Sequence, residues 1–297
     1  STWADFIIIA DQMSTDGSRD IYKQYDKVVL IENNNPDFNE AERQSMLVAK
    51  AREVANKRDC VLFGLDADEI FTANYTNTDD WKSILNSNPG AVFWFKWAEI
   101  SPNKKHYGDS VYYPWMFHDD GKEPHGNYVR NMHSMRIPYP IVAQQTHFVN
   151  DFRILHLAYL NMNRVASKCR FYSFVDYEMN KRSVISLSRN YRYIKKLEEF
   201  TIKDNFFDYN ENISVLNEVD TTSKKFWFDE YILERCATNL NRIAKLDIWD
   251  NDFLETYNLQ DPRKWYHKLL HFYLHKTQQY KSTFIVRAID KVLKMFV

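Results

Sequence analysis

The sequence lacks several features that would assign a protein to a class at once. Its three cysteines, Cys60, Cys169 and Cys236, lie far apart without a CxxC pair, which argues against a zinc site or a disulfide framework and fits a reducing compartment. Positive and negative charges nearly cancel, with 39 basic and 40 acidic residues and a formal net charge of -1. Bulk electrostatics therefore favours neither a nucleic acid nor an acidic membrane surface as a partner.

Long apolar runs are also missing. No stretch approaches the roughly 18 apolar residues of a membrane span, no signal peptide is visible, and we expect a cytoplasmic protein. The sequence contains no internal repeat and no low-complexity tract. Its 297 residues are enough to bury a sizeable core, as one large domain or as one domain with an appendage.

The first half of the chain alternates between strand and helix patterns. Apolar runs predict strands and capped or amphipathic segments predict helices, in the order strand 6–10, a short helix, strand 28–31, helix from residue 39, strand 60–65, helix 79–85 and strand 91–97. This order implies an α/β fold of the doubly wound class, with a mostly parallel sheet and covering helices. Beyond Asp176 the sequence becomes helical and amphipathic, which predicts one domain over residues 1–175 and a helical C-terminal region over residues 176–297.

An acidic cluster follows the strand predicted at residues 60–65. The stretch FGLDADEIF places Asp66, Asp68 and Glu69 within four residues of one another. Ligands of open α/β sheets bind outside the carboxyl ends of the strands, and carboxylate oxygens are ligands for hard divalent cations. The cluster therefore predicts a site for a divalent cation that carries a phosphorylated substrate.

Five further side chains are candidate site residues, and each also has an ordinary structural explanation. Asp11 ends the first strand and is soon followed by STDG, a combination of residues that is common in ordinary loops. Arg43 opposes the dipole of the helix in whose first turn it lies, so it is either solvated or close to an anion. Arg164 and Lys168 share one helix face, which an anion or solvent would explain. For His156, a core histidine bonded to backbone is favoured over a metal ligand.

Residues 101–140 predict a long loop that is dense in aromatic and polar groups, and loops of this length are usually functional. Aromatic faces suit sugar rings, although a loop folded over its own aromatic side chains explains them equally well. The candidate aromatic walls are Tyr112, Tyr113, Trp115 and Phe117. The candidate hydrogen-bonding and acid-base groups are Asp109, His118, Asp119, Asp120, Glu123 and His125.

Two motifs in this order, DQMSTDGS at residues 11–18 and LDADE at residues 65–69, resemble those of family 2 glycosyltransferases of the GT-A fold. The resemblance covers roughly residues 4–175. It implies that Asp11 contacts a nucleotide, and that Asp66 and Asp68 hold Mg²⁺ or Mn²⁺ on the diphosphate of a nucleotide sugar.

The downstream segment HLAYLNMNRVASKCRFY is similar to a subgroup of bacterial enzymes that build lipopolysaccharide or other surface glycans. In that subgroup a histidine resembling His156 completes the metal or phosphate site, and a lysine resembling Lys168 meets the diphosphate. Two departures accompany the resemblance. Gln12 stands where the family usually has a second aspartate, and the βα unit that normally precedes the STDG motif is expected to be absent.

The resemblance implies an inverting hexosyltransferase that moves a sugar from a nucleotide-diphosphate sugar to a glycan or glycolipid acceptor. A cation and basic side chains, here Arg43 and Lys168, would neutralise charge on the leaving diphosphate. Glu69 would lie behind the metal ligands or near the sugar. The base that deprotonates the acceptor would be Asp119 or Asp120, because both lie in the stretch expected to cover the acceptor.

The sequence is also compatible with two other functions. A phosphatase of the haloacid dehalogenase type also places DxDx[TV] after a strand, and DADEI at residues 66–70 differs from that pattern at one position. That motif usually follows the first strand, whereas here two predicted strands precede it. The non-enzymatic alternative is a glycan-binding or scaffolding protein that has lost its donor site.

The C-terminal segment FIVRAIDKVLKMFV carries Arg287, Lys291 and Lys294 opposite apolar residues. Such a helix predicts either peripheral contact with an anionic membrane, on its inner face, or docking against the protein body, and docking is slightly favoured. Upstream, His267, His271 and His275 recur at helical spacing. They could chelate a soft metal, but a polar helix face is favoured.

Overall fold

The computed structural model describes residues 3–122, 134–138, 145–192, 200–201 and 216–296. These residues form two compact units, and each is considered by itself. The described part of the first unit covers residues 3–98, 109–122, 134–138 and 145–156. The described part of the second covers residues 99–108, 157–192, 200–201 and 216–296.

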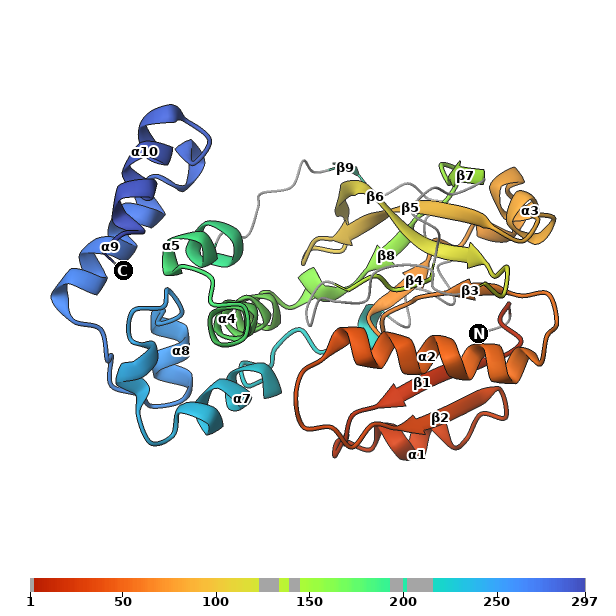
Figure 1. The fold of residues 1–297 in the computed structure, drawn as a ribbon, viewed down its shortest axis with the longest axis horizontal. Coiled ribbons are helices and arrows are strands. Elements are labelled where there is room, and N and C mark those ends of the chain that lie inside the picture. The colour runs from red at the N-terminus through yellow and green to blue at the C-terminus, as the bar shows by residue number, and fades with distance from the viewer. Residues whose placement is uncertain (1–2, 123–133, 139–144, 193–199, 202–215, 297) are drawn as a thin grey trace. The chain divides into compact units, whose positions relative to one another are not determined.

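The first unit is built on a small parallel sheet and a larger mixed sheet (Figure 1). Strands β1 and β2 form the parallel pair, with Ile7 opposite Val28 and Asp11 opposite Glu32. The larger sheet has the order β3-β6-β5-β8-β4, with β7 paired to β5 and β9 to β6. The elements are β1 (Ile7–Asp11), α1 (Ser18–Tyr22), β2 (Val28–Glu32), α2 (Glu40–Ala55), β3 (Val61–Phe63), β4 (Glu69–Phe71), η1 (Tyr75–Asn77), α3 (Asp79–Leu85), β5 (Ala91–Ile100), β6 (His106–His118), β7 (Gln145–Phe148) and β8 (Ile154–His156). The short strand β9 (Phe200–Thr201) belongs to the second unit, as do the last two residues of β5 and the first three of β6.

The predicted doubly wound, mostly parallel sheet is wrong. The larger sheet is mostly antiparallel and strongly curled into a half-barrel. Strand β3 pairs antiparallel with β6, β4 with β8, and β6 with β9, while β5 and β7 are parallel. Two segments account for the error: residues 69–71 form strand β4, and residues 106–118, predicted as loop, form the 13-residue strand β6.

Strand β6 was missed because Pro114 and a dense mixture of polar and aromatic residues interrupt any strand pattern. Proline has no N–H to donate to a neighbouring strand. Here the β3–β6 ladder does not reach the proline. Its last pair is Phe63 opposite Met116, and beyond that pair the Gly64 N–H donates to the Trp115 carbonyl at 3.0 Å. The proline is therefore tolerated within a long strand.

Local signals predicted the helices more closely than the sheet. The Asn39 side chain accepts a hydrogen bond from the Glu42 N–H at 3.2 Å and caps α2. Helix α3 occupies the predicted residues, and the Thr78 hydroxyl caps it by accepting from the Trp81 N–H at 3.1 Å. These contacts lie within three residues of each other in sequence, so they do not depend on the strand order.

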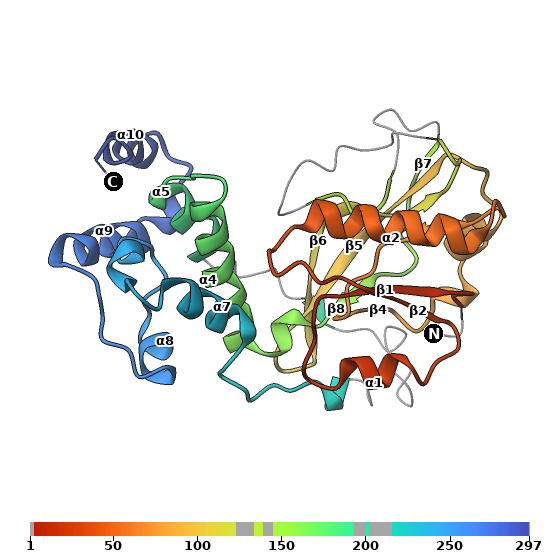
Figure 2. The ribbon, with the colours of Figure 1, turned by 60° about the horizontal axis from the view of Figure 1, so that its bottom comes forward.

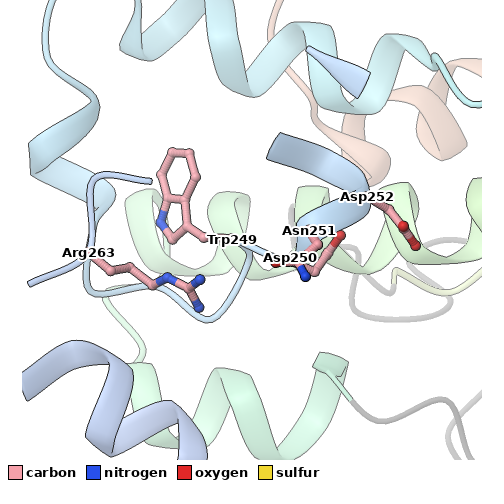
Figure 3. Close-up of a pocket in the computed structure, with 5 residues that line it drawn as sticks. All are labelled: Trp249, Asp250, Asn251, Asp252 and Arg263. Atoms are coloured by element: carbon pink, nitrogen blue, oxygen red, sulfur yellow. The ribbon is translucent and has the colours of Figure 1, made fainter. Parts of the chain in front are cut away.

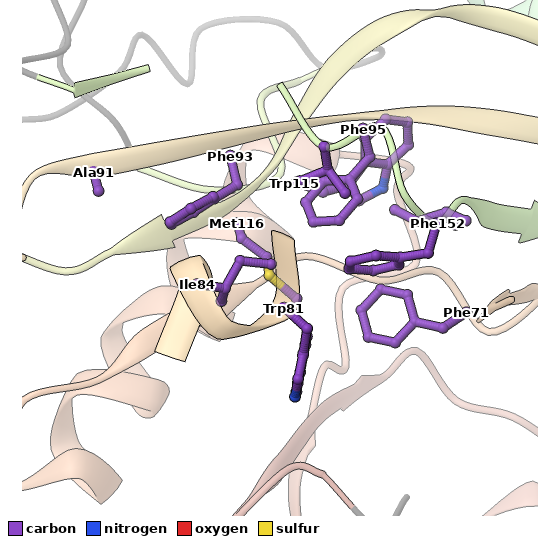
Figure 4. Packing of buried hydrophobic residues seen from close by; sticks show 11 residues of the cluster. Phe71, Trp81, Ile84, Ala91, Phe93, Phe95, Trp115, Met116 and Phe152 are labelled. Carbon is purple, nitrogen blue, oxygen red and sulfur yellow. The ribbon is translucent and has the colours of Figure 1, made fainter. Parts of the chain in front are cut away.

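The core of the first unit is an aromatic cluster between the curled sheet and α3 (Figure 4). Phe95 and Phe152 are fully buried, and their ring centroids lie 5.6 Å apart in an edge-on arrangement. Phe71 of β4 packs edge-on against Phe152 at 5.3 Å. Because Phe71 lies two residues after Glu69, this packing fixes the backbone that follows the acidic cluster.

The second unit is helical, so the prediction of a helical C-terminal region is confirmed. Figure 2 shows its helices from another side. Within the described ranges, no helix is both long and apolar enough to cross a membrane. The elements are η2 (Ala158–Leu160), α4 (Met162–Glu178), α5 (Val184–Leu187), η3 (Ser188–Arg192), α7 (Trp227–Cys236), η4 (Leu240–Ile243), α8 (Asn251–Thr256), α9 (Trp265–Lys276), η5 (Gln278–Tyr280) and α10 (Phe284–Leu293).

The aromatic core predicts a large penalty for truncating one of its rings. Phe95→Ala should lower the free energy of unfolding by about 3–5 kcal/mol, because the change removes buried apolar surface and leaves a cavity. Leu85→Ala is the control, since Leu85 is 65% exposed and its loss should cost less than about 0.5 kcal/mol. Equilibrium urea unfolding measures both. Equal effects of the two substitutions would contradict the assigned core.

Candidate functional site

The acidic cluster forms a tight turn between β3 and β4, hereafter the acidic turn (Asp66–Glu69). The Glu69 N–H donates to the Asp66 carbonyl at 3.1 Å, and the Asp66 N–H donates to the Glu69 Oε2 at 2.9 Å. The side chains differ in exposure: Asp66 is 43% exposed and Asp68 is 18% exposed, whereas Glu69 is fully buried. The turn thus presents two acids outward and uses the third as its internal support.

Arg136 holds the acidic turn together. Its Nη1 donates to the Glu69 Oε2 and its Nη2 to the Asp66 Oδ2, each at 2.7 Å. The guanidinium lies over the rings of Trp97 and Trp115, 5.3 and 5.1 Å from their centroids. Burial opposes its charge, but attraction to Glu69 and Asp66 outweighs burial and raises the pKa of Arg136. A permanently charged group therefore neutralises this pair of acids.

Trp97 and His156 complete the surroundings of the turn. The Trp97 Nε1–H donates to the Glu69 Oε1 at 2.7 Å, and the Trp97 ring stacks on the His156 ring with centroids 4.8 Å apart. Strand pairing sets Glu69 opposite His156, which brings the His156 Nε2 to 3.8 Å from the Asp68 Oδ2. Tyr113, which is 42% exposed, packs against Trp97 with ring centroids 5.3 Å apart.

The predicted metal ligands are Asp66, Asp68 and His156. Within the described residues, no group of three or more His, Cys, Asp or Glu side chains is arranged to hold a metal ion alone. Mg²⁺, however, is usually held by one or two carboxylates together with substrate phosphates. The donor set at the acidic turn fits a cation of that shared kind.

Asp11 lies at the end of β1 and is almost fully buried, with 3% of its surface exposed. Its Oδ1 accepts from the Ser14 N–H at 3.1 Å and from the Arg19 Nε at 2.7 Å. Burial alone would raise the pKa of this carboxyl, but the bonds from Ser14 and Arg19 outweigh burial and lower it. The Oδ2 is buried without a donor from the described residues. Buried acceptors are normally satisfied, so this oxygen has the chemistry to receive a ligand N–H or O–H.

The other predicted phosphate-binding cations have local contacts. Arg43 on α2 lies with its Nη2 4.0 Å from the Glu40 Oε1 and its guanidinium over Phe38 at 5.9 Å. Lys168 belongs to α4 of the second unit, where its Nζ lies over Tyr172 at 5.8 Å. The roles assigned to both residues stay predictions.

The structure does not bring the predicted bases to the acidic turn. The Asp119 N–H donates to the Cys60 carbonyl at 2.9 Å, which places Asp119 beside the start of β3, whereas the turn follows the end of β3. Arg52 binds both Asp119 oxygens at 2.8 and 2.9 Å. Asp120 accepts from the Lys122 N–H at 3.0 Å. These contacts support the end of β6, and the structure supplies no geometric reason to choose either aspartate as the base.

Other groups from the predicted loop are mostly structural. Trp115 and Phe117 are buried core residues of β6 and cannot serve as exposed walls. Asp109 forms ion pairs with Lys96 at 3.6 Å and with Arg153 at 3.3 Å. The His118 ring lies between Asp59 and Ser87, at 3.0 and 2.9 Å. Glu123 and His125 lie outside the described residues.

The second unit contains a cavity of about 270 Å³ that holds none of the predicted site residues (Figure 3). Its lining is Trp249, Asp250, Asn251, Asp252 and Arg263. Internal bonds already engage three of these side chains. The Trp249 Nε1–H donates to the Ile243 carbonyl at 3.1 Å, Arg263 donates to both Asp261 oxygens at 2.8 and 2.9 Å, and the Asp250 Oδ2 accepts from the Arg170 Nη1 at 3.0 Å. The helical histidines bind internally as well, with the His275 Nε2 2.8 Å from Asp247 and the His271 Nε2 2.9 Å from the Lys245 carbonyl.

Arg136 and Trp97 are the site residues that sequence reasoning missed. One signal pointed toward Arg136. Gly64 is one of only six glycines, and a side chain there would place its Cβ 2.7 Å from the Arg136 Cβ. A glycine just before an acidic motif therefore indicates a close approach, although it does not identify the approaching residue.

Comparison of the sequence with known protein families and with curated proteins finds no match in either. The geometry of the acidic turn and of Asp11, together with the motif resemblance, therefore indicates what the protein does.

Removing Arg136 should leave the buried Glu69 charge uncompensated. Arg136→Met is expected to lower the free energy of unfolding by about 3 kcal/mol, as measured by equilibrium urea unfolding. The matched control is the double variant Arg136→Met/Glu69→Gln. It should recover much of the loss, because no buried charge then remains unpaired. A single variant as stable as the parent protein, or a double variant as unstable as the single one, would show that the ion pair does not support the turn.

Proposed function

We propose that this protein is a metal-dependent glycosyltransferase that takes its sugar from a nucleotide-diphosphate sugar and transfers it, with inversion, to a glycan or glycolipid acceptor. The acidic turn carries the proposal: two partly exposed aspartates are held in a fixed turn by a buried ion pair. The motif resemblance to family 2 glycosyltransferases, including those that build lipopolysaccharide and other surface glycans, supports the same assignment.

Asp11 supplies the second argument. Its buried Oδ2 has no donor among the described residues, while Arg19 and Ser14 keep the carboxyl ionised. An ionised carboxylate with one satisfied oxygen and one oxygen that lacks a donor is suited to accept a hydrogen bond from a nucleotide base or ribose. We therefore assign Asp11 to the nucleotide and the acidic turn to the diphosphate.

The chemistry requires the leaving nucleoside diphosphate to be stabilised as its charge develops. When bound, Mg²⁺ or Mn²⁺ would supply that charge, held by Asp66 and Asp68 with His156 nearby. Arg136 keeps the turn in place while occupying one oxygen of Asp66. The exposed face of Tyr113 offers a stacking surface for a sugar ring. The reducing compartment expected for such an enzyme agrees with three free thiols.

Asp68 is the residue on which turnover should depend most. Asp68→Asn is expected to reduce turnover of the preferred nucleotide sugar by at least about a hundredfold, because it removes a negative charge that would hold a cation at the diphosphate. The measurement is release of the nucleoside diphosphate across a panel of nucleotide sugars with Mn²⁺. Asp79→Asn is the control, since the Asp79 side chain is 90% exposed on α3, and it should retain full activity.

The reaction products also distinguish a glycosyltransferase from the alternative functions. A glycosyltransferase releases a nucleoside diphosphate and forms a new glycoside, whereas a phosphatase releases inorganic phosphate. Full turnover by Asp68→Asn would rule out the assigned role of the acidic turn. Phosphate release, with a covalent phosphate on Asp66, would replace the proposal by the phosphatase.

Cation binding should depend on the phosphate ligand. Because the described residues form no metal cluster alone, calorimetric titration of the protein with Mn²⁺ should show little binding in the absence of a nucleotide. Titration in the presence of the matching nucleoside diphosphate should show binding that is lost in Asp68→Asn. A pure scaffold would show no nucleotide-dependent uptake, and tight Mn²⁺ binding without nucleotide would contradict the shared-cation site.

A further inference from the structure

The last helix, α10, packs against its own unit through a polar anchor. Only Val286 and Asp290 of α10 are buried among its described residues. Both oxygens of Asp290 accept from Arg189 at 2.9 Å, and the Tyr273 hydroxyl donates to the Asp290 Oδ1 at 3.0 Å. Arg189 also donates to the Leu274 carbonyl at 2.8 Å. A buried ion pair therefore decides which face of α10 points inward.

The apolar face of α10 consequently points to solvent. Apart from the buried Val286 and the half-buried Leu293, its large apolar side chains are exposed. On the helix these are Phe284 at 86%, Ile285 at 69%, Ile289 at 41% and Val292 at 55%, and just beyond its end lie Met295 at 77% and Phe296 at 78%. Amphipathic helices of a globular protein normally turn this face toward the core. An exposed apolar patch of this kind marks an interaction surface.

Helix α9 has the same character. Leu270 and Leu274 are buried on its inner side, while Trp265, Leu269 and Phe272 are 75%, 60% and 60% exposed. Tryptophan and phenylalanine on an outer helix face are typical of helices that lie at a membrane interface. Two consecutive helices of the second unit thus leave aromatic and aliphatic side chains uncovered.

Basic residues accompany these apolar side chains. The segment from residue 264 to residue 296 contains one acid, Asp290, which is engaged by Arg189. Its lysines and arginines are Lys264, Lys268, Lys276, Lys281, Arg287, Lys291 and Lys294. All seven are exposed. Arg287, Lys291 and Lys294 form no ion pair within the described part of the chain. The near-neutral chain thus concentrates positive charge on the segment with the exposed apolar face.

We infer that the outer faces of α9 and α10 form a docking surface for an anionic lipid bilayer. Apolar side chains would enter the boundary between headgroups and acyl chains, while lysines and Arg287 meet the lipid phosphates. Charge complementarity favours this occupant over a second copy of the chain. In a symmetric dimer this surface would face itself, which would bring its like charges together.

Vesicle sedimentation with the full chain tests this inference. The protein should pellet with vesicles of phosphatidylcholine mixed with phosphatidylglycerol, much less with phosphatidylcholine alone, and less as salt is raised. Lys291→Glu/Lys294→Glu should weaken binding to the anionic vesicles by at least about tenfold. Phe284→Ser/Ile285→Ser should weaken it similarly, and because both side chains are exposed, thermal unfolding should remain unchanged.

Matched controls change similar side chains elsewhere. Lys23→Glu/Lys82→Glu replaces two lysines that are 71% and 64% exposed, and Leu85→Ser replaces an apolar residue that is 65% exposed. Both variants should bind vesicles as the parent protein does. The inference is overturned if the parent protein does not pellet with anionic vesicles, or if the control variants lose binding as strongly as the α10 variants. It is equally overturned if light scattering shows a dimer that Phe284→Ser/Ile285→Ser dissociates.

Discussion

A largely buried arginine, with 19% of its side chain exposed, is the element on which the candidate site depends. Arg136 is far from Asp66 and Glu69 in sequence, yet its two nitrogens bind one oxygen of each acid at 2.7 Å. Without it, three acids within four residues would repel one another, and Glu69 would be an unpaired charge in the core. The ion pair allows Asp66 and Asp68 to remain at the surface in a defined geometry, which is what a phosphate-bound cation requires.

In the second unit, ion pairs between arginine and aspartate hold helices together in the same way. Arg170 binds both oxygens of Asp229 and also Asp250, joining α4 to α7 and to the start of α8. Arg189 fixes α10 through Asp290. Such bidentate pairs are directional, so they set how a helix is rotated about its own axis. In α10 that rotation, rather than apolar burial, determines which side chains face solvent.

The sequence predicted the helices of the first unit and the strands β1, β2, β3 and β5, but it missed β4 and β6 and gave the wrong strand arrangement. The capping contacts of α2 and α3 involve residues three apart, so composition and spacing were sufficient. The mostly parallel sheet was inferred from alternation alone, but β4 lies only six residues after β3, and no helix separates them. Alternation cannot reveal that β4 pairs with β8 or β3 with β6, because antiparallel partners are chosen by packing across distant segments.

By itself, the sequence determined the acidic motif, the strand-end Asp11, the helical C-terminal region and the amphipathic character of the last helix, because each is a pattern of neighbouring residues. Only the tertiary structure decided which acids face outward, that Asp119 lies beside the start of β3 and away from the acidic turn, and that α10 turns its apolar side to solvent. The physical reason is the same in each case. Pairing a charge in the interior requires a partner from a distant segment, and sequence spacing carries no information about that partner.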